Sequence, residues 1–195
     1  GVDYLAMAYI AGQTLAERLQ TGPLPPAEAV RLTIGLATAI QHAHEQGVIH
    51  RDLKPSNVLL DQQARPHVTD FGLARRLSES AMRATATGQV LGTPAYMPPE
   101  QATGSTDIGP ASDIYSLGAT LYELLAGRPP FTADSIALLQ DQILHREPPP
   151  IRLSRAQVPV DLETICGKCL AKEPERRYPN AAELALDLGR YLRRE

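Results

Sequence analysis

Apolar residues in the first part of the chain repeat first as a continuous run and then at helical spacing. Residues 4–10 form a short apolar run that ends at Gly12, which predicts a buried strand followed by a turn. Thr14 stands three residues before Glu17, the spacing at which the two side chains cap the start of a short helix. Residues 26–46 begin with proline and place apolar residues three and four apart, so they predict a long core helix.

The hydrophobic period changes after residue 47. Short apolar runs separated by polar turns predict small strands that frame loops, and these runs lie at residues 48–49, 58–60 and 68–69. Residues 71–110 are rich in Thr, Ser, Gly and Pro and show no sustained period. They predict a long irregular loop, which a compact domain rarely carries without a binding or regulatory role.

The second half of the chain predicts helices only. Ser112 precedes an apolar stripe and predicts the capped start of a helix that ends at Ala126. The consecutive prolines 148–150 predict an extended linker. Further amphipathic patterns predict helices over residues 134–145, over residues 160–171 and from Asn180 onwards. We expect a single domain, because no boundary, repeat or low-complexity tract interrupts these patterns.

The composition excludes several classes of protein. The 195 residues are 43% apolar and 21% charged, with 14 glycines and 17 prolines, unlike a disordered or collagen-like chain. A net charge of −3 gives no electrostatic argument for binding nucleic acid or an anionic membrane. No apolar stretch approaches the roughly 20 residues of a membrane span, and the two cysteines are too few for a disulfide framework. We therefore expect a cytoplasmic protein, with no membrane contact from this segment.

Three short motifs follow one another in the middle of the chain. Residues 50–57 read His-Arg-Asp-Leu-Lys-Pro-Ser-Asn and match the catalytic-loop pattern H-R-D-L-x-x-x-N at every fixed position. Asp70-Phe71-Gly72 begins 18 residues after Asp52, and Pro98-Pro99-Glu100 stands where a segment ending in A-P-E closes. D-F-G alone is a weak signal, but its spacing from the first motif makes it specific.

With these motifs the chain resembles the eukaryotic-like Ser/Thr protein kinases of bacterial type, from the hinge strand to the last helix. The resemblance implies an α+β, mainly α fold, namely the large C-terminal lobe of a protein kinase with the N-terminal lobe absent. Residues 1–195 would then be part of one protein kinase domain, with residues 70–100 as its activation segment.

Phosphoryl transfer requires a carboxylate at the acceptor hydroxyl, and oxygen ligands for a metal ion that neutralises phosphate charge. The resemblance implies that Asp52 is the base, that Asn57 and Asp70 hold Mg²⁺, and that Lys54 contacts the transferred phosphate. Mn²⁺ is the alternative metal, and ATP is the phosphate donor. Lys54 together with Thr93 before a proline is similar to the branch that phosphorylates Ser and Thr.

The resemblance also places a nucleotide pocket at the hinge. Met7 corresponds to the gatekeeper, and the backbone of Ala8 and Ile10 to the groups that meet the adenine edge. Leu59 would pack below the adenine, and Thr69 would line the pocket floor. The alternative is that these side chains are ordinary strand core, which the pattern alone does not separate from pocket lining.

Arg51 beside Asp52 is similar to the kinases in which a phosphorylated activation loop meets a basic pocket. Thr85 and Thr87 resemble the Thr-x-Thr autophosphorylation pair of bacterial kinases and rank above Ser78 and Ser80 as acceptors. Unmodified loop threonines are the alternative.

Three further residues have structural roles by the same resemblance. Asp113 would anchor the backbone of the catalytic loop, and Arg177 would pair with Glu100. The alternative for the pair is plain surface charge.

Cysteines and histidines outside these motifs give no metal or redox site. Cys166 and Cys169 form C-x-x-C inside a helical pattern, without a second pair or a thioredoxin-like strand, so we expect buried helix cysteines. The remaining histidines show no ligand spacing: His42, His44, His67 and His145.

Two functions remain open. The first is the catalytic lobe of a Ser/Thr protein kinase, whose partners are protein substrates, the N-lobe of the same chain and a second kinase for autophosphorylation. A membrane tether on the parent protein would leave this domain on the cytoplasmic side. The Gly-rich loop, strand lysine and helix glutamate do not occur before the hinge, so we expect the isolated chain to be a poor catalyst. The second is a truncated or pseudokinase-like, non-catalytic interaction lobe. Intact Asp52, Asn57 and Asp70 favour the first.

Overall fold

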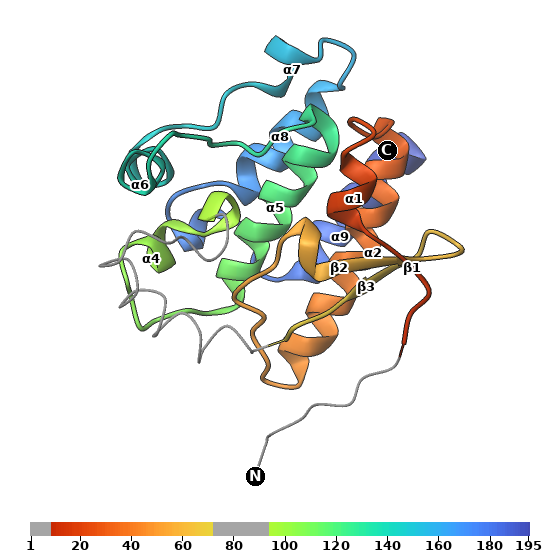
Figure 1. Cartoon of the computed structure of the whole chain (residues 1–195), viewed down its shortest axis with the longest axis horizontal. Coiled ribbons are helices and arrows are strands. Elements are labelled where there is room, and N and C mark those ends of the chain that lie inside the picture. Colours follow the sequence, from red (N-terminus) through yellow and green to blue (C-terminus); the bar gives the residue numbers. More distant parts are fainter. Residues whose placement is uncertain (1–8, 72–93) are drawn as a thin grey trace.

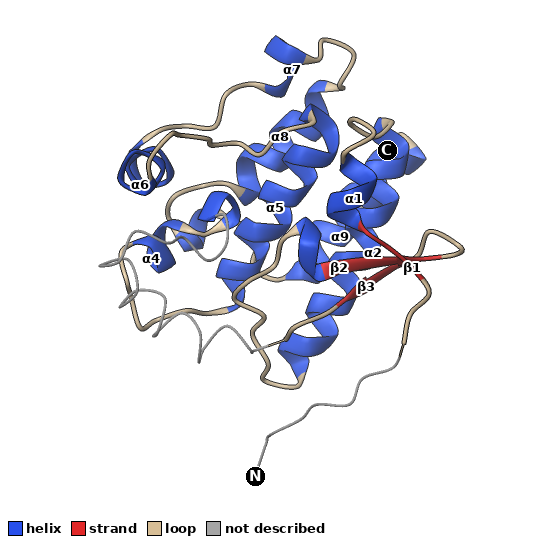
Figure 2. Cartoon of the chain, viewed as in Figure 1, coloured by secondary structure: helices blue, strands red, loops and turns tan. Residues whose placement is uncertain are grey.

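The computed structural model describes residues 9–71 and 94–195, and this part of the chain is mainly helical with one small sheet (Figure 1, Figure 2). The centre is formed by α2 (Pro26–Glu45) and α5 (Pro110–Ala126), which pack on each other. Helix α9 (Ala181–Arg193) lies on α2, and α8 (Val160–Cys169) lies on α5. The expected fold class is confirmed.

Helix α2 begins where the sequence predicts it. Pro26 occupies the first helical position, where the missing N–H has no helical partner to lose. Its buried face presents Leu32, Leu36 and Ile40, spaced four residues apart, to the core. Burial of these side chains against α5 and α9 holds the helix in place.

Helix α5 is almost entirely buried, and its start differs from the prediction. It begins at Pro110 with Gly109 as the N-cap residue, so the prediction that Ser112 caps this helix was wrong. The Ser112 hydroxyl donates instead to the Glu100 carboxylate at 2.6 Å. A Cβ at Gly118 would lie 2.3 Å from the Cys169 Cβ, so glycine permits the close approach of α5 and α8.

The sheet has three antiparallel strands in the order β1 (Gly12–Thr14), β2 (Val58–Asp61) and β3 (Pro66–Val68). The predicted turn at Gly12 was wrong, because Gly12 begins a strand and pairs with Asp61. A Cβ on Gly12 would lie 1.8 Å from the Leu60 carbonyl oxygen, so the glycine serves close strand contact.

The other predicted strands were right in part. Residues 9 and 10, the described end of the predicted strand over residues 4–10, are not in a strand, and neither are residues 48–49. Residues 58–60 lie in β2, and the run at 68–69 supplies the last residue of β3. The wrong predictions at residues 9–10 and 48–49 share one cause, which is that a short apolar run needs a pairing partner before it becomes a strand.

Short helices join these elements. The capping box of Thr14 and Glu17 starts α1 (Leu15–Leu19), and Asn180 caps α9, both as predicted. The stretch that we expected to be irregular, residues 71–110, contains two short helices in its described part. The expected linker of prolines at residues 148–150 is followed by another short helix. The remaining helices are η1 (Pro55–Asn57), η3 (Pro94–Tyr96), α4 (Pro99–Ala102), α6 (Ile136–His145), α7 (Ile151–Ser154) and η4 (Pro174–Arg176).

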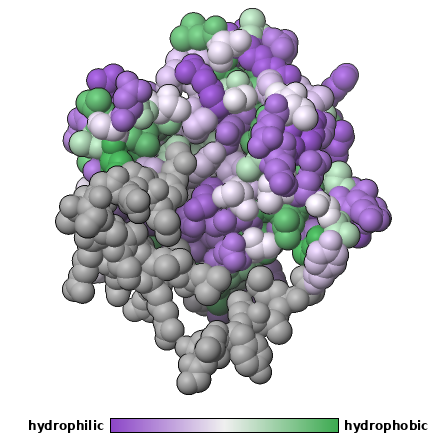
Figure 3. Space-filling view, in the orientation of Figure 1, coloured by the Kyte–Doolittle hydropathy of each residue, from purple (hydrophilic) through white to green (hydrophobic). Residues whose placement is uncertain are grey.

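Helix α6 packs in a small apolar cluster of its own. Leu139 and Ile143 of α6 are buried with Phe131, next to Ala102 of α4, and this cluster is separate from the main core. On the face shown in Figure 3, hydrophobic side chains gather over α6 and α7, where Leu138 and Leu153 are exposed. Within the described residues, no helix combines the length and the apolar character needed to cross a membrane.

Candidate active site

The catalytic loop, residues 50–57, is held by one buried carboxylate on α5. Asp113 accepts hydrogen bonds from the backbone N–H groups of His50 and Arg51, both at 2.8 Å. The Asp113 carboxylate also lies 2.8 Å from His44 Nε2 on α2. Arg51 has a φ of 69°, which is unfavourable for a residue with a Cβ. The charge-assisted hydrogen bonds of Asp113 offset that backbone strain and fix the course of the loop.

His50 joins the catalytic loop to the strand end that precedes Asp70. Its Nε2 lies 2.8 Å from the Thr69 carbonyl oxygen, and its Nδ1 lies 3.3 Å from the backbone N–H of Asp52. Since an N–H and a carbonyl face the two ring nitrogens, the ring carries its proton on Nε2. The ring also meets Phe71 edge to face, with centroids 4.8 Å apart. His50 thus connects the two motifs.

Asp52 lies at the surface of the loop with its carboxylate surrounded by donors. Lys54 Nζ is 2.7 Å and 3.0 Å from the two carboxylate oxygens, and Asn57 Nδ2 is 3.1 Å from one of them. The Asp52 side chain remains 40% exposed. An ionised carboxylate is therefore oriented by an ammonium and an amide, yet still open to a hydroxyl from another molecule.

Asn57 and Asp70 come together through the register of the sheet. Val58 of β2 pairs with Val68 of β3, and the Thr69 backbone N–H donates to the Asn57 carbonyl at 2.9 Å. Asp70 follows directly, with a φ of 61°. The pairing therefore brings the residue before β2 next to the two residues after β3.

The donor set suits a hard divalent cation. The amide nitrogen of Asn57 donates to the backbone carbonyl and the carboxylate of Asp52, which leaves the amide oxygen Oδ1 as the acceptor. Amide and carboxylate oxygens are ligands that Mg²⁺ accepts, usually with phosphate oxygens and water completing the shell. In the described ranges 9–71 and 94–195, no group of three His, Cys, Asp or Glu side chains forms a complete metal site.

Side chains of β2 alternate between the face that packs on the core and the opposite face. Val58 and Leu60 are buried in the main core, whereas Leu59 is half-buried on the opposite face, paired with His67. Leu59 is thus outside the main core, as are the half-buried Ile10 and Thr69. Of the other predicted pocket and activation residues, Met7, Ala8, Thr85, Thr87 and Thr93 lie outside the described part of the chain.

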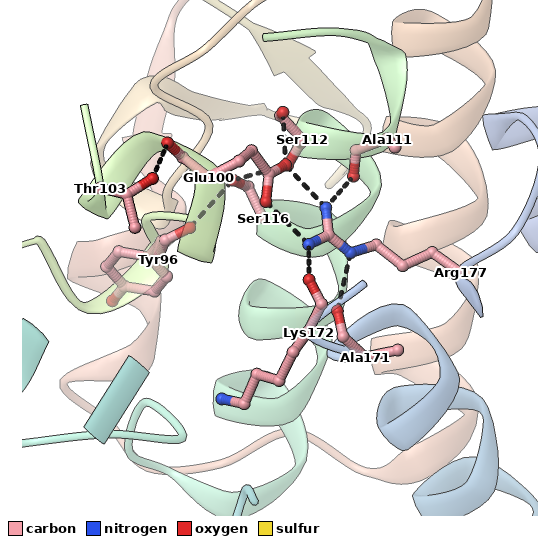
Figure 4. Close-up of polar contacts among 9 residues, drawn as sticks. All are labelled: Tyr96, Glu100, Thr103, Ala111, Ser112, Ser116, Ala171, Lys172 and Arg177. Carbon is pink, nitrogen blue, oxygen red and sulfur yellow. Dashed lines mark hydrogen bonds and ion pairs between the residues drawn. The ribbon is translucent and has the colours of Figure 1, made fainter. Parts of the chain in front are cut away.

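Glu100 and Arg177 form a buried ion pair between α4 and the segment before α9 (Figure 4). Arg177 donates to both Glu100 oxygens at 2.8 Å and to the carbonyls of Ala171, Lys172 and Ala111 at 2.8–2.9 Å. The Arg177 side chain has no exposed surface. Burial opposes ionisation of Glu100, but the hydrogen bonds from Arg177 and Ser112 outweigh it and lower the pKa of this carboxyl.

A second set of polar contacts fixes η3 to α5. The Tyr96 hydroxyl donates to the Glu123 carboxylate on α5, and Ser116 Oγ donates to the Tyr96 carbonyl at 2.9 Å. Burial raises the pKa of Glu123 above its ordinary value. Sequence reasoning missed this contact, and it missed His44 and Ser112, because a single polar residue on an apolar helix carries no signal of its partner.

The two cysteines of the C-x-x-C sequence lie on the buried side of α8, as expected for residues without a redox or metal role in the sequence pattern. Cys166 and Cys169 are buried, and burial raises the pKa of both thiols, which disfavours the reactive thiolate.

A cavity of about 590 Å³ lies at the far end of β2, between α1, α2 and the turn before β3. Its lining does not include Asp52, Asn57 or Asp70, so it is separate from the catalytic loop.

The fold and this loop define a protein kinase domain, and the comparison with known families agrees. The family described as "Protein kinase domain" matches residues 2–186, and the chain belongs to this family.

Several curated relatives of the chain are named as bacterial Ser/Thr kinases. "Serine/threonine-protein kinase PknB" of Mycolicibacterium smegmatis is 40% identical over 190 residues, which cover 97% of this chain and 30% of the relative. "Probable serine/threonine-protein kinase SCO3848" of Streptomyces coelicolor is 39% identical over 188 residues, covering 96% and 28%. "Probable serine/threonine-protein kinase PknB" of Bifidobacterium longum is 38% identical over 192 residues, covering 98% and 28%. The chain therefore spans less than a third of the length of these relatives.

Proposed function

We propose that the chain is the catalytic lobe of a Ser/Thr protein kinase, which transfers the γ-phosphate of ATP to Ser or Thr hydroxyls of proteins. The observation that carries this proposal is that Asp52 is hydrogen-bonded to both Lys54 and Asn57, while Thr69, the residue before Asp70, is hydrogen-bonded to the Asn57 carbonyl. A lobe that served binding alone would have no chemical need for a base and metal ligands together.

The roles follow from the chemistry of each group. The Asp52 carboxylate accepts the proton of the acceptor hydroxyl, and its exposure leaves room for that hydroxyl. The Lys54 ammonium neutralises charge on the transferred phosphate, which matters most where water is excluded. Asn57 and Asp70 would hold Mg²⁺ or Mn²⁺, which supplies charge neutralisation of the nucleotide phosphates when bound.

The nucleotide would lie on the face of β2 that is turned away from the core. Leu59 and Thr69 belong to that face, and Ile10 lies before the adjacent strand β1. Met7 and Ala8 precede Ile10 in the chain, so we propose that the adenine edge meets the backbone of residues 8–10. Leu59 then packs on the adenine ring.

Activation by phosphorylation is part of the same proposal. Arg51 is part of the loop that Asp113 fixes through the Arg51 backbone N–H, and a phosphate on Thr85 or Thr87 would offer the Arg51 guanidinium a dianionic partner. Transfer to these threonines would require a second copy of the kinase, and Thr93 would contact the acceptor residue. A cytoplasmic location of the domain stays a prediction.

The test is labelled phosphate transfer from ATP with Mg²⁺ to a Ser/Thr protein acceptor. It compares the chain alone with a form extended upstream through a kinase N-lobe, each as wild type, as Asp52→Asn and as Asp107→Asn. Asp107 is an exposed carboxylate outside the site and serves as the matched control. We expect transfer by the extended wild type and Asp107→Asn only, with a loss of about 10²–10⁴-fold in Asp52→Asn.

Two results would contradict the proposal. Transfer that survives Asp52→Asn unchanged would remove Asp52 as the base. If no extended form transfers phosphate, although it is folded and its activation segment is phosphorylated, the non-catalytic interaction lobe is favoured instead.

A further inference from the structure

Helix α6 packs against few other elements and shares little buried apolar surface with the rest of the lobe. Its main neighbours are α4 and η3, and Figure 1 shows it at the edge of the molecule, beside α4. Its buried side chains, Leu139 and Ile143, belong to the small cluster around Phe131 and not to the main core. A unit with so little shared apolar surface opens at a lower free energy than the core.

One side chain connects this cluster to the main body. Lys172 Nζ donates to the Ile143 carbonyl oxygen at 2.6 Å and lies 4.5 Å from the centroid of the Phe131 ring. Two of the three buried residues of the cluster are therefore contacted by one amine. The Ile143 carbonyl belongs to the last turn of α6, where carbonyls have no helical partner, so the amine also caps the helix.

The other end of Lys172 is fixed in the main body. Its backbone carbonyl accepts a hydrogen bond from Arg177 Nη2 at 2.9 Å, and Arg177 pairs with Glu100 of α4. Figure 4 shows the Lys172 backbone against the Arg177 guanidinium and the amine at the far end of an extended side chain. Lys172 thus bridges the buried ion pair and the C-terminal turn of α6.

We propose that Lys172 is a positioning residue that ties α6 to the lobe, so that α6 opens and closes as a unit of its own while Glu100 keeps α4 on the main body. Its amine supplies the polar half of this attachment, and the small apolar cluster supplies the rest. Without the amine, the Ile143 carbonyl loses its donor and the Phe131 ring loses its contact with a cation.

The test is hydrogen exchange of the full chain, read by mass spectrometry for each helix. Lys172→Met keeps the apolar stem and removes the donor, and we expect exchange of α6 to speed up by about tenfold to a hundredfold, with α4, α8 and α9 unchanged. Lys172→Arg keeps a cationic donor and should restore most of the protection. The matched control is Lys168→Met, since Lys168 also lies over an aromatic ring, that of Tyr178, but on α8.

The outcomes separate clearly. Unchanged exchange of α6 in Lys172→Met, or equal acceleration in α6, α8 and α9, overturns the tie. If Lys172→Met does not fold, hydrogen exchange of the wild type tests the proposal instead. In low denaturant, α6 should open with a free energy below that of α4 and α5, and merging of α6 with α5 overturns the proposal.

A kinase assay extends the test and rests on the proposed function. Residues 94–100 belong to the expected activation segment, and α6 packs against η3 and α4 there, so loosening α6 should raise the KM for a protein acceptor severalfold while kcat for ATP hydrolysis changes little. An unchanged KM beside faster α6 exchange would overturn the positioning role. This assay uses the form extended through a kinase N-lobe, and failure of that extended wild type to transfer phosphate would overturn only the proposed function, because exchange requires no ATP.

Discussion

The buried pair of Glu100 and Arg177 offers the sharpest test of what holds the lobe together. Arg177→Met removes five hydrogen bonds at once while keeping an unbranched side chain of similar length. It also leaves the Glu100 carboxylate in a site that is 13% exposed, with Ser112 as its remaining side-chain donor. Loss of one partner from a buried ion pair costs far more than the pair itself contributes.

The expected cost is about 3–5 kcal/mol of unfolding free energy. For a domain of this size, about 2–4 °C of melting temperature accompany each kcal/mol, so the midpoint should fall by about 6–20 °C. Urea unfolding followed by far-UV circular dichroism measures the free energy directly. The double variant Glu100→Gln with Arg177→Met should recover part of the loss, because no unpaired charge then remains.

Arg176→Met is the matched control. Arg176 is adjacent in sequence, is 73% exposed and pairs with Glu173 at 3.5 Å, so its removal should change stability by less than about 0.5 kcal/mol. If Arg177→Met unfolds within about 1 kcal/mol of the wild type, or no more easily than Arg176→Met, the reasoning from burial and unpaired charge is refuted.

Two further predictions concern packing and acid stability. Gly118→Ala forces a Cβ toward Cys169 and should cost about 1–3 kcal/mol in urea unfolding, whereas Gly167→Ala meets open space and should gain up to about 1 kcal/mol; equal effects would contradict the packing argument. The lowered pKa of Glu100 means that its ionised form adds stability above its ordinary pKa of 4.5, and that this stability is lost as pH falls toward the lower folded value. The stability difference between wild type and Glu100→Gln should therefore be largest near neutral pH and shrink in acid, and a difference that stays constant from pH 7 to pH 3 would speak against the linkage.

Sequence reasoning succeeded where a structure is specified by neighbouring residues. The cap of α1 by Thr14 and Glu17, the start of α2 at Pro26 and the cap of α9 at Asn180 all depend on groups a few residues apart. The motif at residues 50–57 likewise places its polar groups within one loop, where the structure has Asp52, Lys54 and Asn57 in contact.

It failed where the determining partner is distant in sequence. Gly12 forms a strand only because β2 pairs with it, and the close approach to the Leu60 carbonyl is visible only in three dimensions. Ser112 has a cap-like sequence context, but Glu100 is within reach and takes its hydroxyl. The contact of His44 with Asp113 bridges 69 residues, a separation across which local pattern carries no information.

The four residues of β2 divide two tasks between alternate positions. Val58 and Leu60 belong to the core, whereas Leu59, between them, faces the side on which we propose the nucleotide binds. Adjacent positions of one strand thus serve different purposes, one set packing in the core and the other, in our proposal, shaping the ligand site. If the adenine ring packs on Leu59, then a smaller residue at this position should admit an enlarged adenine analogue while Val58 and Leu60 keep the strand packed on the core.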